Sequence, residues 1–434
     1  MEPNWTPLDN AAKIYPAASR RSWSALFRVS VNLSEAVDPS ILLAALHRVA
    51  GRLPVFFMRL QRGAFWYYLE DANVGLRVEE EGVCPCLPLR HAENNGYSFR
   101  VLYYKNRISA EFYHILTDGA GGMVFLKTLV AEYLEIKYGI LVPRSKDILD
   151  CRIGPRAEDA RDSFLEHAGK VGGSRGEKRA FRIQGTPSGG FHHLTTAKVP
   201  TDAILAAAKA AGATLTEYLT ALMIRAVQDL QETAQARETR RKPVKINVPV
   251  NLRRFFPSET LRNFSSYVNP GIDPRLGRYS FEEVLTQVRH QIGAQATRKH
   301  LAAKFTQNVL DAQNKVLRLA PLFLKNLVLK SVFMLVGDAL TSTCLSNLGQ
   351  QNLPSEMARY VERMDFILGP LSLNPIACAC LSYNGTLYFN VTRSIEESSF
   401  ERTLFRSLVE RGVPVEVESN QRSAMFNAQC RMKR

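Results

Sequence analysis

Strand-like and helix-like hydrophobic patterns follow one another in mixed order along both halves of this 434-residue chain. Residues 24–33 alternate apolar and polar side chains, which is typical of a half-buried strand. Asp38 and Pro39 then supply an N-cap and a first helical residue ahead of an apolar helical face. A strand-like segment at 191–199 and a helical pattern beginning near Thr201 repeat this order in the second half. The patterns therefore predict an α/β (α+β) fold with two related layers rather than one doubly wound sheet.

The segment between the two halves has a different composition. Residues 169–179 are rich in glycine and charge and lack apolar periodicity, as is usual in crossovers and loops. We therefore expect an N-terminal domain at 1–170, a linker or crossover at 171–190 and a C-terminal domain at 191–434.

The net charge of +15 suits nucleic acid, an anionic membrane surface or a phosphorylated small molecule. No zinc-finger, homeodomain or RRM signature is present, so nucleic-acid binding is not expected. The first residues lack the pattern of a signal peptide, and no apolar run approaches the roughly 18 residues of a spanning helix. These features predict a soluble, cytoplasmic protein, which we expect to be a monomer.

Seven cysteines are present, and their two close pairs are C-x-C rather than the C-x-x-C of zinc or redox sites. Cys378 and Cys380 fall in a strand-like run, where both sulfurs would point to one face. We interpret them as small core hydrophobes in a reducing compartment. The histidines show no H-E-x-x-H spacing, so no metal site is predicted.

The pattern H-x-x-x-D-G, formed by His114, Asp118 and Gly119, lies where a predicted strand at 107–113 leads through a glycine-rich loop into a helix closed by Gly139. An imidazole at such a strand end can take a proton from a hydroxyl near neutral pH. A carboxylate four residues later can orient the ring, as in a triad, or can face away and pin the loop to a cation. The alternative is a core histidine bonded to a backbone carbonyl.

This motif with its flanks, YHILTDGAGG at 113–122, resembles the active-site signature of the chloramphenicol-acetyltransferase-like superfamily. That group includes alcohol acetyltransferases, wax ester synthases, polyketide-associated acyltransferases and the condensation domains of nonribosomal peptide synthetases. Three further segments resemble motifs of the family and occur in the same order along the chain: VPVNLR at 248–253, LSNLG at 345–349 and LSYNGTLYF at 381–389. The helix at 212–219 also resembles the one that opens the family's second domain. The resemblance covers nearly the whole chain and is closest to the alcohol-acetyltransferase branch.

One departure concerns the plant-type branch, whose D-F-G-W-G motif is absent. DFILG at 365–369 is at best a degenerate trace of it, which argues against that branch.

The resemblance implies two similar domains, each a mixed sheet with helices, with an active-site tunnel between them. It implies that His114 is the general base and that Asp118 is structural, bonding an arginine of the second domain. Arg253 is the first candidate for that partner, and Arg254 and Arg262 compete with it.

Further roles follow from the same resemblance. Gly119 would allow a close turn, and Ser346 and Asn347 match the polar pair beside which the family stabilises the oxyanion. For these two residues, an ordinary turn at a strand end is the alternative.

The implied donor is acyl-CoA, carrying an acetyl or another short-to-medium acyl group, and the implied acceptor is a small or lipophilic alcohol. Basic residues just before the VPVNLR strand are candidates to meet the CoA phosphates, with a solvated charged loop as the alternative: Arg240, Arg241, Lys242 and Lys245. No bound cofactor or metal is expected. Helical patterns at 281–304 and 306–339, the second strongly amphipathic and basic, either pack on the core, cover the tunnel or touch an anionic membrane.

Three functions remain open from the sequence. The first is O-acylation of an alcohol from acyl-CoA, without an acyl-enzyme because no G-x-S-x-G nucleophile elbow is present. The second uses a donor bound to an acyl carrier protein, as condensation domains do. The third is a non-catalytic binding role.

Overall fold

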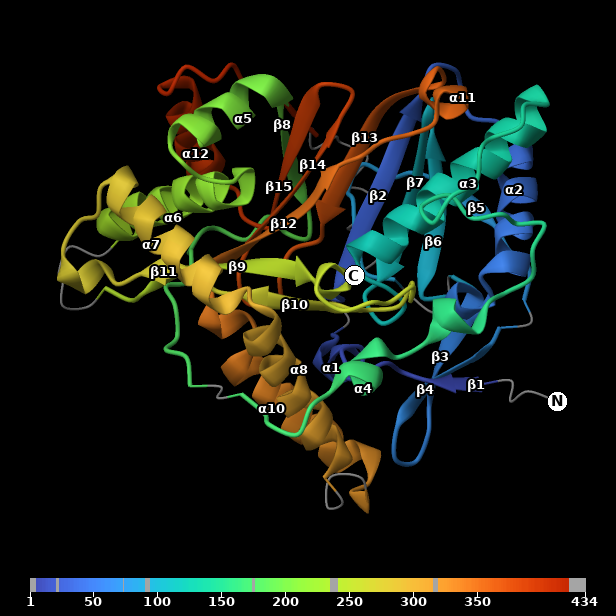
Figure 1. Cartoon of the computed structure of the whole chain (residues 1–434), viewed down its shortest axis with the longest axis horizontal. Helices are drawn as coiled ribbons and strands as arrows, with labels where there is room; N and C mark the ends of the chain where they lie inside the picture. The colour runs from blue at the N-terminus through green and yellow to red at the C-terminus, as the bar shows by residue number, and fades with distance from the viewer. Residues whose placement is uncertain are drawn as a thin grey trace.

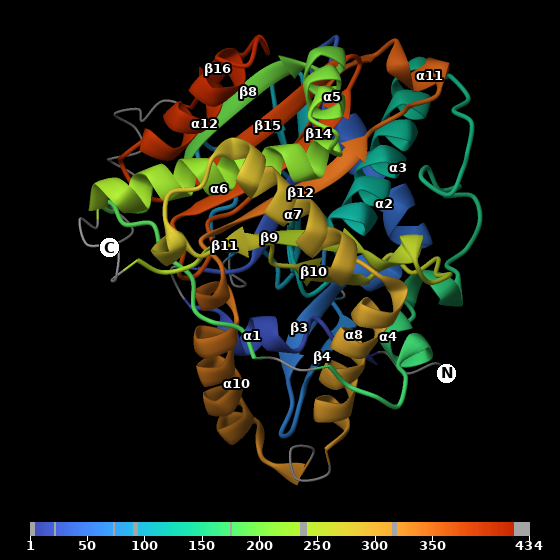
Figure 2. The same ribbon diagram turned by 60° about the vertical axis from the view of Figure 1, so that its left-hand side comes forward.

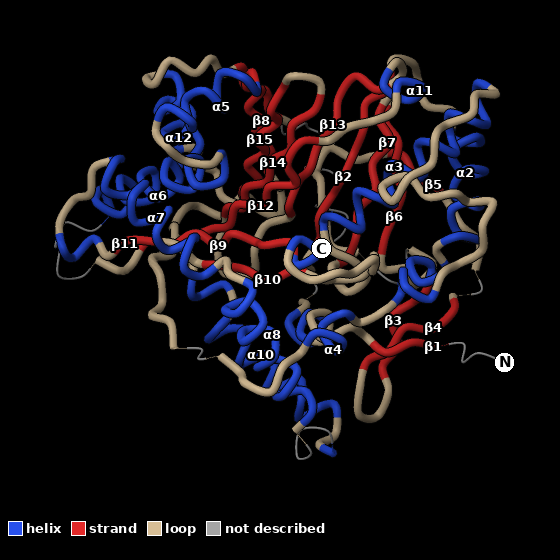
Figure 3. Tube along the Cα trace, in the orientation of Figure 1, coloured by secondary structure: helices blue, strands red, loops and turns tan. Residues whose placement is uncertain are grey.

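A computed structural model describes residues 5–20, 23–72, 74–89, 94–173, 176–234, 241–314 and 319–420. Two sheets stand side by side, and helices cover their outer flanks (Figures 1 and 3). Both sheets are mixed, because each contains parallel as well as antiparallel pairs. The predicted fold class, with two mixed sheets and their helices, is therefore confirmed.

The smaller sheet is built mainly from the N-terminal half. Its strands, in spatial order, are β13 (Val361–Leu368), β2 (Leu26–Leu33), β7 (Arg107–Tyr113), β6 (Phe99–Tyr104) and β5 (Val78–Glu80). Helices α2 (Pro39–Arg52) and α3 (Gly119–Tyr138) pack against each other beside this sheet. Asp38 caps α2 by accepting from two backbone N–H groups, and Gly139 ends α3 in the left-handed conformation, as the sequence predicts.

The larger sheet belongs to the C-terminal half. Its strands, in spatial order, are β10 (Ser265–Val268), β9 (Val244–Asn251), β12 (Thr343–Gln350), β14 (Ile376–Tyr383), β15 (Thr386–Arg393), β8 (His193–Pro200) and β16 (Glu416–Ser419), with β11 (Gly271–Ile272) paired to β9. Its helices are α5 (Thr201–Ala210), α6 (Leu215–Ala234), α7 (Phe281–Gln295) and α12 (Ser399–Val409). The side chains of Thr214 and Glu217 form the expected capping box at the start of α6.

The predicted division at 171–190 does not separate the sheets cleanly. After β12 the chain passes through α11 (Ser355–Ala358) and adds β13 to the N-terminal sheet, antiparallel to β2. It then returns to the C-terminal sheet as β14. One strand of the smaller sheet therefore comes from far along the chain.

A third, three-stranded sheet lies in the lower part of the molecule and has the order β1 (Trp5–Pro7), β4 (Tyr67–Asp71) and β3 (Met58–Arg62). Two short helices lie near it, α1 (Ile14–Ala18) and α4 (Ser163–His167). Helices α8 (Arg298–Gln313) and α10 (Leu322–Val336) project away from the large sheet in both views (Figures 1 and 2).

The breaks between the later helices differ from the sequence prediction. Thr297 caps α8 with its side chain, so the first break precedes residue 298, and Pro321 stands at the N-terminus of α10. In the described part of the predicted helix at 306–339, residues 306–313 therefore belong to α8, and α10 is a separate helix. Among the described residues, no helix has both the length and the apolar character needed to cross a bilayer.

Candidate active site

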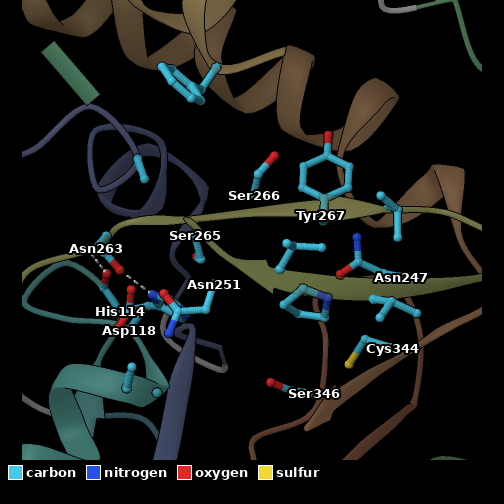
Figure 4. Close-up of a pocket in the computed structure, with 18 of the residues that line it drawn as sticks. His114, Asp118, Asn247, Asn251, Asn263, Ser265, Ser266, Tyr267, Cys344 and Ser346 are labelled. Carbon is cyan, nitrogen blue, oxygen red and sulfur yellow. Dashed lines mark hydrogen bonds between the residues drawn. The ribbon is translucent and has the colours of Figure 1, made fainter. Parts of the chain in front are cut away.

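A cavity of about 2280 Å³ lies between the two halves of the chain. Its walls include β9 and β10 on one side and the start of α3 on the other. Amide and hydroxyl groups line the strand side, where Asn247, Asn251, Ser265 and Ser266 are drawn in Figure 4. This volume exceeds the roughly 300–1,000 Å³ of a usual single-ligand pocket. It therefore leaves room for two substrates to meet.

His114 follows the last residue of β7 and lines this cavity. Its backbone N–H donates to the carbonyl of Ala25 at 2.9 Å, which continues the pairing of β7 with the strand beside it. The half-buried ring stacks on Tyr15 with centroids 5.0 Å apart, and Phe27 meets it edge-on at 5.4 Å. Two rings therefore restrict how the imidazole can rotate.

Asn263 determines which nitrogen of the imidazole carries the proton. Its Nδ2 group donates to two acceptors, the Asp9 carboxylate and the His114 carbonyl oxygen, each at 2.9 Å. Because both partners can only accept, the amide orientation is fixed by chemistry, and Oδ1 must face the ring. The His114 Nδ1–H then donates to Oδ1 at 2.8 Å (Figure 4). Nε2 is left with its lone pair and has no hydrogen bond to any described residue, which is the state a general base requires.

Asp118 faces away from the imidazole and holds the loop instead. Its Oδ2 accepts from Arg253 Nη1 at 2.8 Å and from the Phe264 N–H at 2.8 Å, while Oδ1 accepts from the Gly121 N–H at 3.1 Å. Although burial alone would raise the pKa of Asp118, the Arg253 guanidinium and these hydrogen bonds hold it below its ordinary value. Asp118 therefore ties the start of α3 to the second half of the chain.

Of the three candidate arginines, the structure joins Arg253 to Asp118. Arg253 also donates to the carbonyl oxygens of Thr260 and Arg262, so its guanidinium is held on several sides. Arg262, only 2% exposed, lies 3.6 Å from the carboxylate of Asp9 instead. Arg254 is exposed and has no ion pair with any described residue.

The glycines of the motif serve close packing rather than an unusual backbone conformation. Gly119 is the first residue of α3 and has no positive φ, so its backbone conformation alone does not require a glycine. A Cβ on Gly119 would approach Leu348 Cδ2 to 3.0 Å, whereas one on Gly121 would lie 2.1 Å from the backbone oxygen of Leu261. Gly121 is therefore the residue that cannot be larger.

Ser346 and Asn347 follow one another on β12 but have different surroundings. The Asn347 side chain donates to Thr216 Oγ1 at 3.2 Å and accepts from the Gly349 N–H at 2.7 Å, so it is occupied within the C-terminal half. Ser346 lines the cavity, and its hydroxyl has no hydrogen bond to any described residue (Figure 4). Asn347 also lines the cavity and keeps a second N–H, but its side chain is held by Thr216 and Gly349, whereas the Ser346 hydroxyl is unconstrained.

The basic residues before β9 do not form one cluster at the cavity. Lys245 lines it, but its amine is paired with Glu177 at 3.2 Å. Arg241 is directed to Glu232, and Lys242 is exposed; neither lines the cavity. Arg240 lies outside the described residues. The geometry therefore supports only Lys245 of the proposed phosphate contacts.

Asn263 and Asp9 contact the site without having been predicted. Asn263 lies in the loop after the VPVNLR segment, and Asp9 lies near the start of the chain, so no local spacing connects either of them to His114. The buried carboxylate of Asp9 also accepts from the Ala12 N–H at 2.8 Å. These contacts form between residues that are far apart in the sequence, so no sequence pattern predicts them.

Comparison with solved structures places the whole architecture among known proteins. Polyketide synthase associated protein 5 from Mycobacterium tuberculosis matches with a TM-score of 0.60 and 15% identity, over 93% of this chain and 96% of that protein. TRI3 trichothecene 15-O-acetyltransferase from Fusarium sporotrichioides matches with a TM-score of 0.59 and 11% identity, over 94% of this chain and 96% of that protein. The fold is chloramphenicol-acetyltransferase-like.

A third structure of this fold is a mutant starter condensation domain of rhizomide synthetase RzmA in complex with C8-CoA and Leu-SNAC. It matches with a TM-score of 0.57 and 13% identity, over 94% of this chain and 95% of that one. No family model and no curated protein matches the sequence. These structural neighbours thus include an O-acetyltransferase and a condensation domain, all at low sequence identity.

Proposed function

We propose that this protein transfers an acyl group from a CoA thioester to the hydroxyl of an alcohol, with His114 as general base. The observation that carries the proposal is the hydrogen bond from His114 Nδ1 to Asn263, which makes Nε2 the acceptor nitrogen of the neutral ring, at a cavity large enough for two substrates. The acetyltransferase among the structural neighbours and the complex of a starter condensation domain with C8-CoA support the donor class. The acyl group is proposed to be acetyl or another short-to-medium chain.

The reaction needs one proton carrier and no covalent enzyme intermediate. Nε2 of His114 takes the hydroxyl proton as the acceptor oxygen bonds to the thioester carbonyl carbon. The resulting oxyanion accepts a hydrogen bond from the unoccupied Ser346 hydroxyl. When the carbon–sulfur bond breaks, the imidazolium returns the proton to the leaving thiolate. Asp118 takes no part in proton transfer, because its three hydrogen bonds are directed to Arg253, Phe264 and Gly121.

His114→Ala tests the proposal. The variant is expected to fold normally and to lose acceptor-dependent release of free thiol from acyl-CoA. The matched control is His47→Ala, which removes an exposed histidine on α2 outside the cavity. Donors and pooled alcohols and amines are screened together by mass spectrometry. Full activity of His114→Ala would refute the mechanism, and no turnover by wild type with any pair would favour a non-catalytic role.

A donor carried by an acyl carrier protein is the second candidate, supported by the condensation domain among the structural neighbours. The same cavity and the same base would serve it. Comparing free CoA thioesters with carrier-bound thioesters in one assay separates the two, because a carrier-dependent enzyme would show much higher kcat/KM with the carrier-bound donor.

Peripheral contact with an anionic membrane is also proposed, as a route for a lipophilic acceptor. Apolar side chains of α10 are exposed, among them Phe323 at 62% and Leu327 at 67%, and Val328 is both exposed and at the cavity wall. Vesicle co-sedimentation tests this contact: Leu327→Ser should reduce binding to anionic vesicles, whereas Leu276→Ser, at another exposed site, should not.

A further inference from the structure

One face of α3 forms a wall of the cavity beyond His114. Gly119, Ala120, Met123, Val124 and Lys127 all line it, a spacing that places them along one side of a helix. At 1.5 Å per residue, Lys127 lies about 12 Å along the helix axis from Gly119. The wall is therefore small or apolar near the base and ends at an amine.

Lys127 is buried and its charge is not balanced by a close partner. The residue is 4% exposed, and its amine has no hydrogen bond or ion pair with any described residue. Asp147, which also lines the cavity, acts on it only at longer range. Burial therefore lowers the pKa of Lys127 despite this carboxylate. A largely buried ammonium group without a partner is destabilising, which is why buried lysines are almost always paired.

Other cations at this end of the cavity show the contrast. Arg52, equally buried, is paired with Asp159, and Arg144 lies 2.8 Å from Glu132 and 2.6 Å from Glu135. Asp159, Glu132 and Glu135 are thus engaged with arginines, which leaves Asp147 as the carboxylate that acts on Lys127.

Two further cations, Lys146 and Arg254, line the same cavity at its exposed rim, and neither has an ion pair with a described residue. Together with Lys127, the lining of this cavity therefore includes three cations that have no ion pair with a described residue.

We propose that Lys127 binds a carboxylate or phosphate group of a substrate that extends from His114 along α3. The assignment of this ligand as a substrate rests on the proposed acyl transfer. The anionic group has two sources of the same chemistry, an acceptor alcohol that carries a carboxylate at its far end or the phosphates of coenzyme A. The apolar side chains of Met123 and Val124 suit an aliphatic segment between the reacting group and the anion.

Binding measurements test this site without any turnover. Titration calorimetry compares wild type, Lys127→Met and Lys137→Met, with coenzyme A, with ω-hydroxy fatty acids, and with diols of the same chain lengths. Lys137 is the matched control, because it lies on the same helix, pairs with Glu35 and does not line the cavity. We expect Lys127→Met to weaken the anionic ligand by about 10- to 100-fold, the range of one hydrogen bond to a charged group, and Lys137→Met to change nothing.

The ligand that loses affinity identifies the source of the anion. Loss with the hydroxy acid and not with the diol assigns the acceptor, and loss with coenzyme A assigns the donor. Wild-type affinity of Lys127→Met for every anionic ligand, or wild type that binds none of them, overturns the proposal. The proposed acyl transfer is tested separately by the activity of His114→Ala, because calorimetry measures binding and requires no reaction.

The stability of the unliganded protein gives a second test. If the charge of Lys127 is balanced only by a bound ligand, removing that charge should stabilise the unliganded protein. Lys127→Met should then melt about 1–4 °C higher than wild type. If Lys127 instead stabilises the fold by attracting Asp147, the variant should melt lower, and the proposal fails.

Discussion

Replacing Asp118 by asparagine distinguishes an anchor of the loop from a partner of the imidazole. The carboxylate accepts three hydrogen bonds, two of them on Oδ2 from Arg253 and Phe264 and one on Oδ1 from Gly121. An asparagine keeps only one accepting oxygen, and its best orientation leaves that oxygen with Arg253 and Phe264. Its NH₂ group then faces the Gly121 N–H, so two donors oppose each other at the first turn of α3.

The expected cost follows from the two losses. Removing the charge partner of a buried cation costs about 3–5 kcal/mol, and losing an N-cap costs about 0.5–2 kcal/mol. Arg253 retains the carbonyl oxygens of Thr260 and Arg262 and is partly exposed, which reduces the first loss. We therefore expect Asp118→Asn to lower the free energy of unfolding by about 3–5 kcal/mol in total. Urea unfolding at pH 7, followed by circular dichroism, measures it.

A surface carboxylate provides the control for this variant. Asp273 also caps a short helix with its side chain and pairs with Arg275, but near the surface. Asp273→Asn should cost less than about 1 kcal/mol, because exposed ion pairs contribute little.

The pH dependence of stability gives the same test with a defined sign. The pKa of Asp118 is lower in the folded protein than its ordinary value of about 3.9. The ionised carboxylate therefore stabilises the fold above that value, and this contribution is lost as the pH falls through the folded pKa. The difference between wild type and Asp118→Asn should accordingly shrink in acid.

Activity decides the role of Asp118. Because Asn263 orients His114, correctly folded Asp118→Asn should keep most of its kcat. A variant with wild-type unfolding free energy and no activity would mean that Asp118 acts on the imidazole, and the anchor argument would be refuted.

Four further predictions concern the orientation of His114, the motif glycines, the oxyanion site and the buried cysteines. Asn263→Leu should lower kcat about 10- to 100-fold, because Nδ1 loses its acceptor and both the ring orientation and the proton position become mixed; steady-state kinetics with unchanged kcat would contradict this. Gly121→Ala should destabilise the fold by about 2–4 kcal/mol in urea, and Gly119→Ala by less, since only the first brings a Cβ within 2.1 Å of a backbone oxygen. Ser346→Ala should lower kcat about 10- to 100-fold without a matching rise in KM, and equal kcat values would remove the hydroxyl from the oxyanion site. The thiols of Cys378 and Cys380 should react with Ellman's reagent only after unfolding, because burial raises the pKa of Cys378 well above its usual range and that of Cys380 to about 12.

Elements with local signals were predictable from the sequence. Each of these signals acts over a few residues: the Asp38 cap before Pro39, the capping box of Thr214 with Glu217, and the Asn384-Gly385 turn. The positive φ angles of Asn384 and Gly385 fit the turn type expected between β14 and β15. Such elements appear in the structure within a few residues of their predicted ends.

Features that depend on distant residues were not predictable. β13 was interpreted only as a trace of an absent motif, because nothing in its sequence indicates that it pairs with β2. The contact of Asn263 with His114 joins positions 149 residues apart, and the unpaired state of Lys127 depends on where neighbouring carboxylates are directed. In each case the information is in the packing of the folded chain and not in any spacing along it.

The path of β13 has a consequence for how the protein is made. Without this strand, the seven residues of β2 from Phe27 to Leu33 would present an unpaired and largely apolar edge, the kind of edge that joins strands of other molecules. During synthesis, β2 is complete more than 300 residues before β13 emerges, so an N-terminal sheet that forms early would have this edge unpaired. The N-terminal half expressed alone would therefore be prone to aggregation, and a peptide covering β13 would act as its missing strand, much as a pilus subunit receives a donor strand from its chaperone.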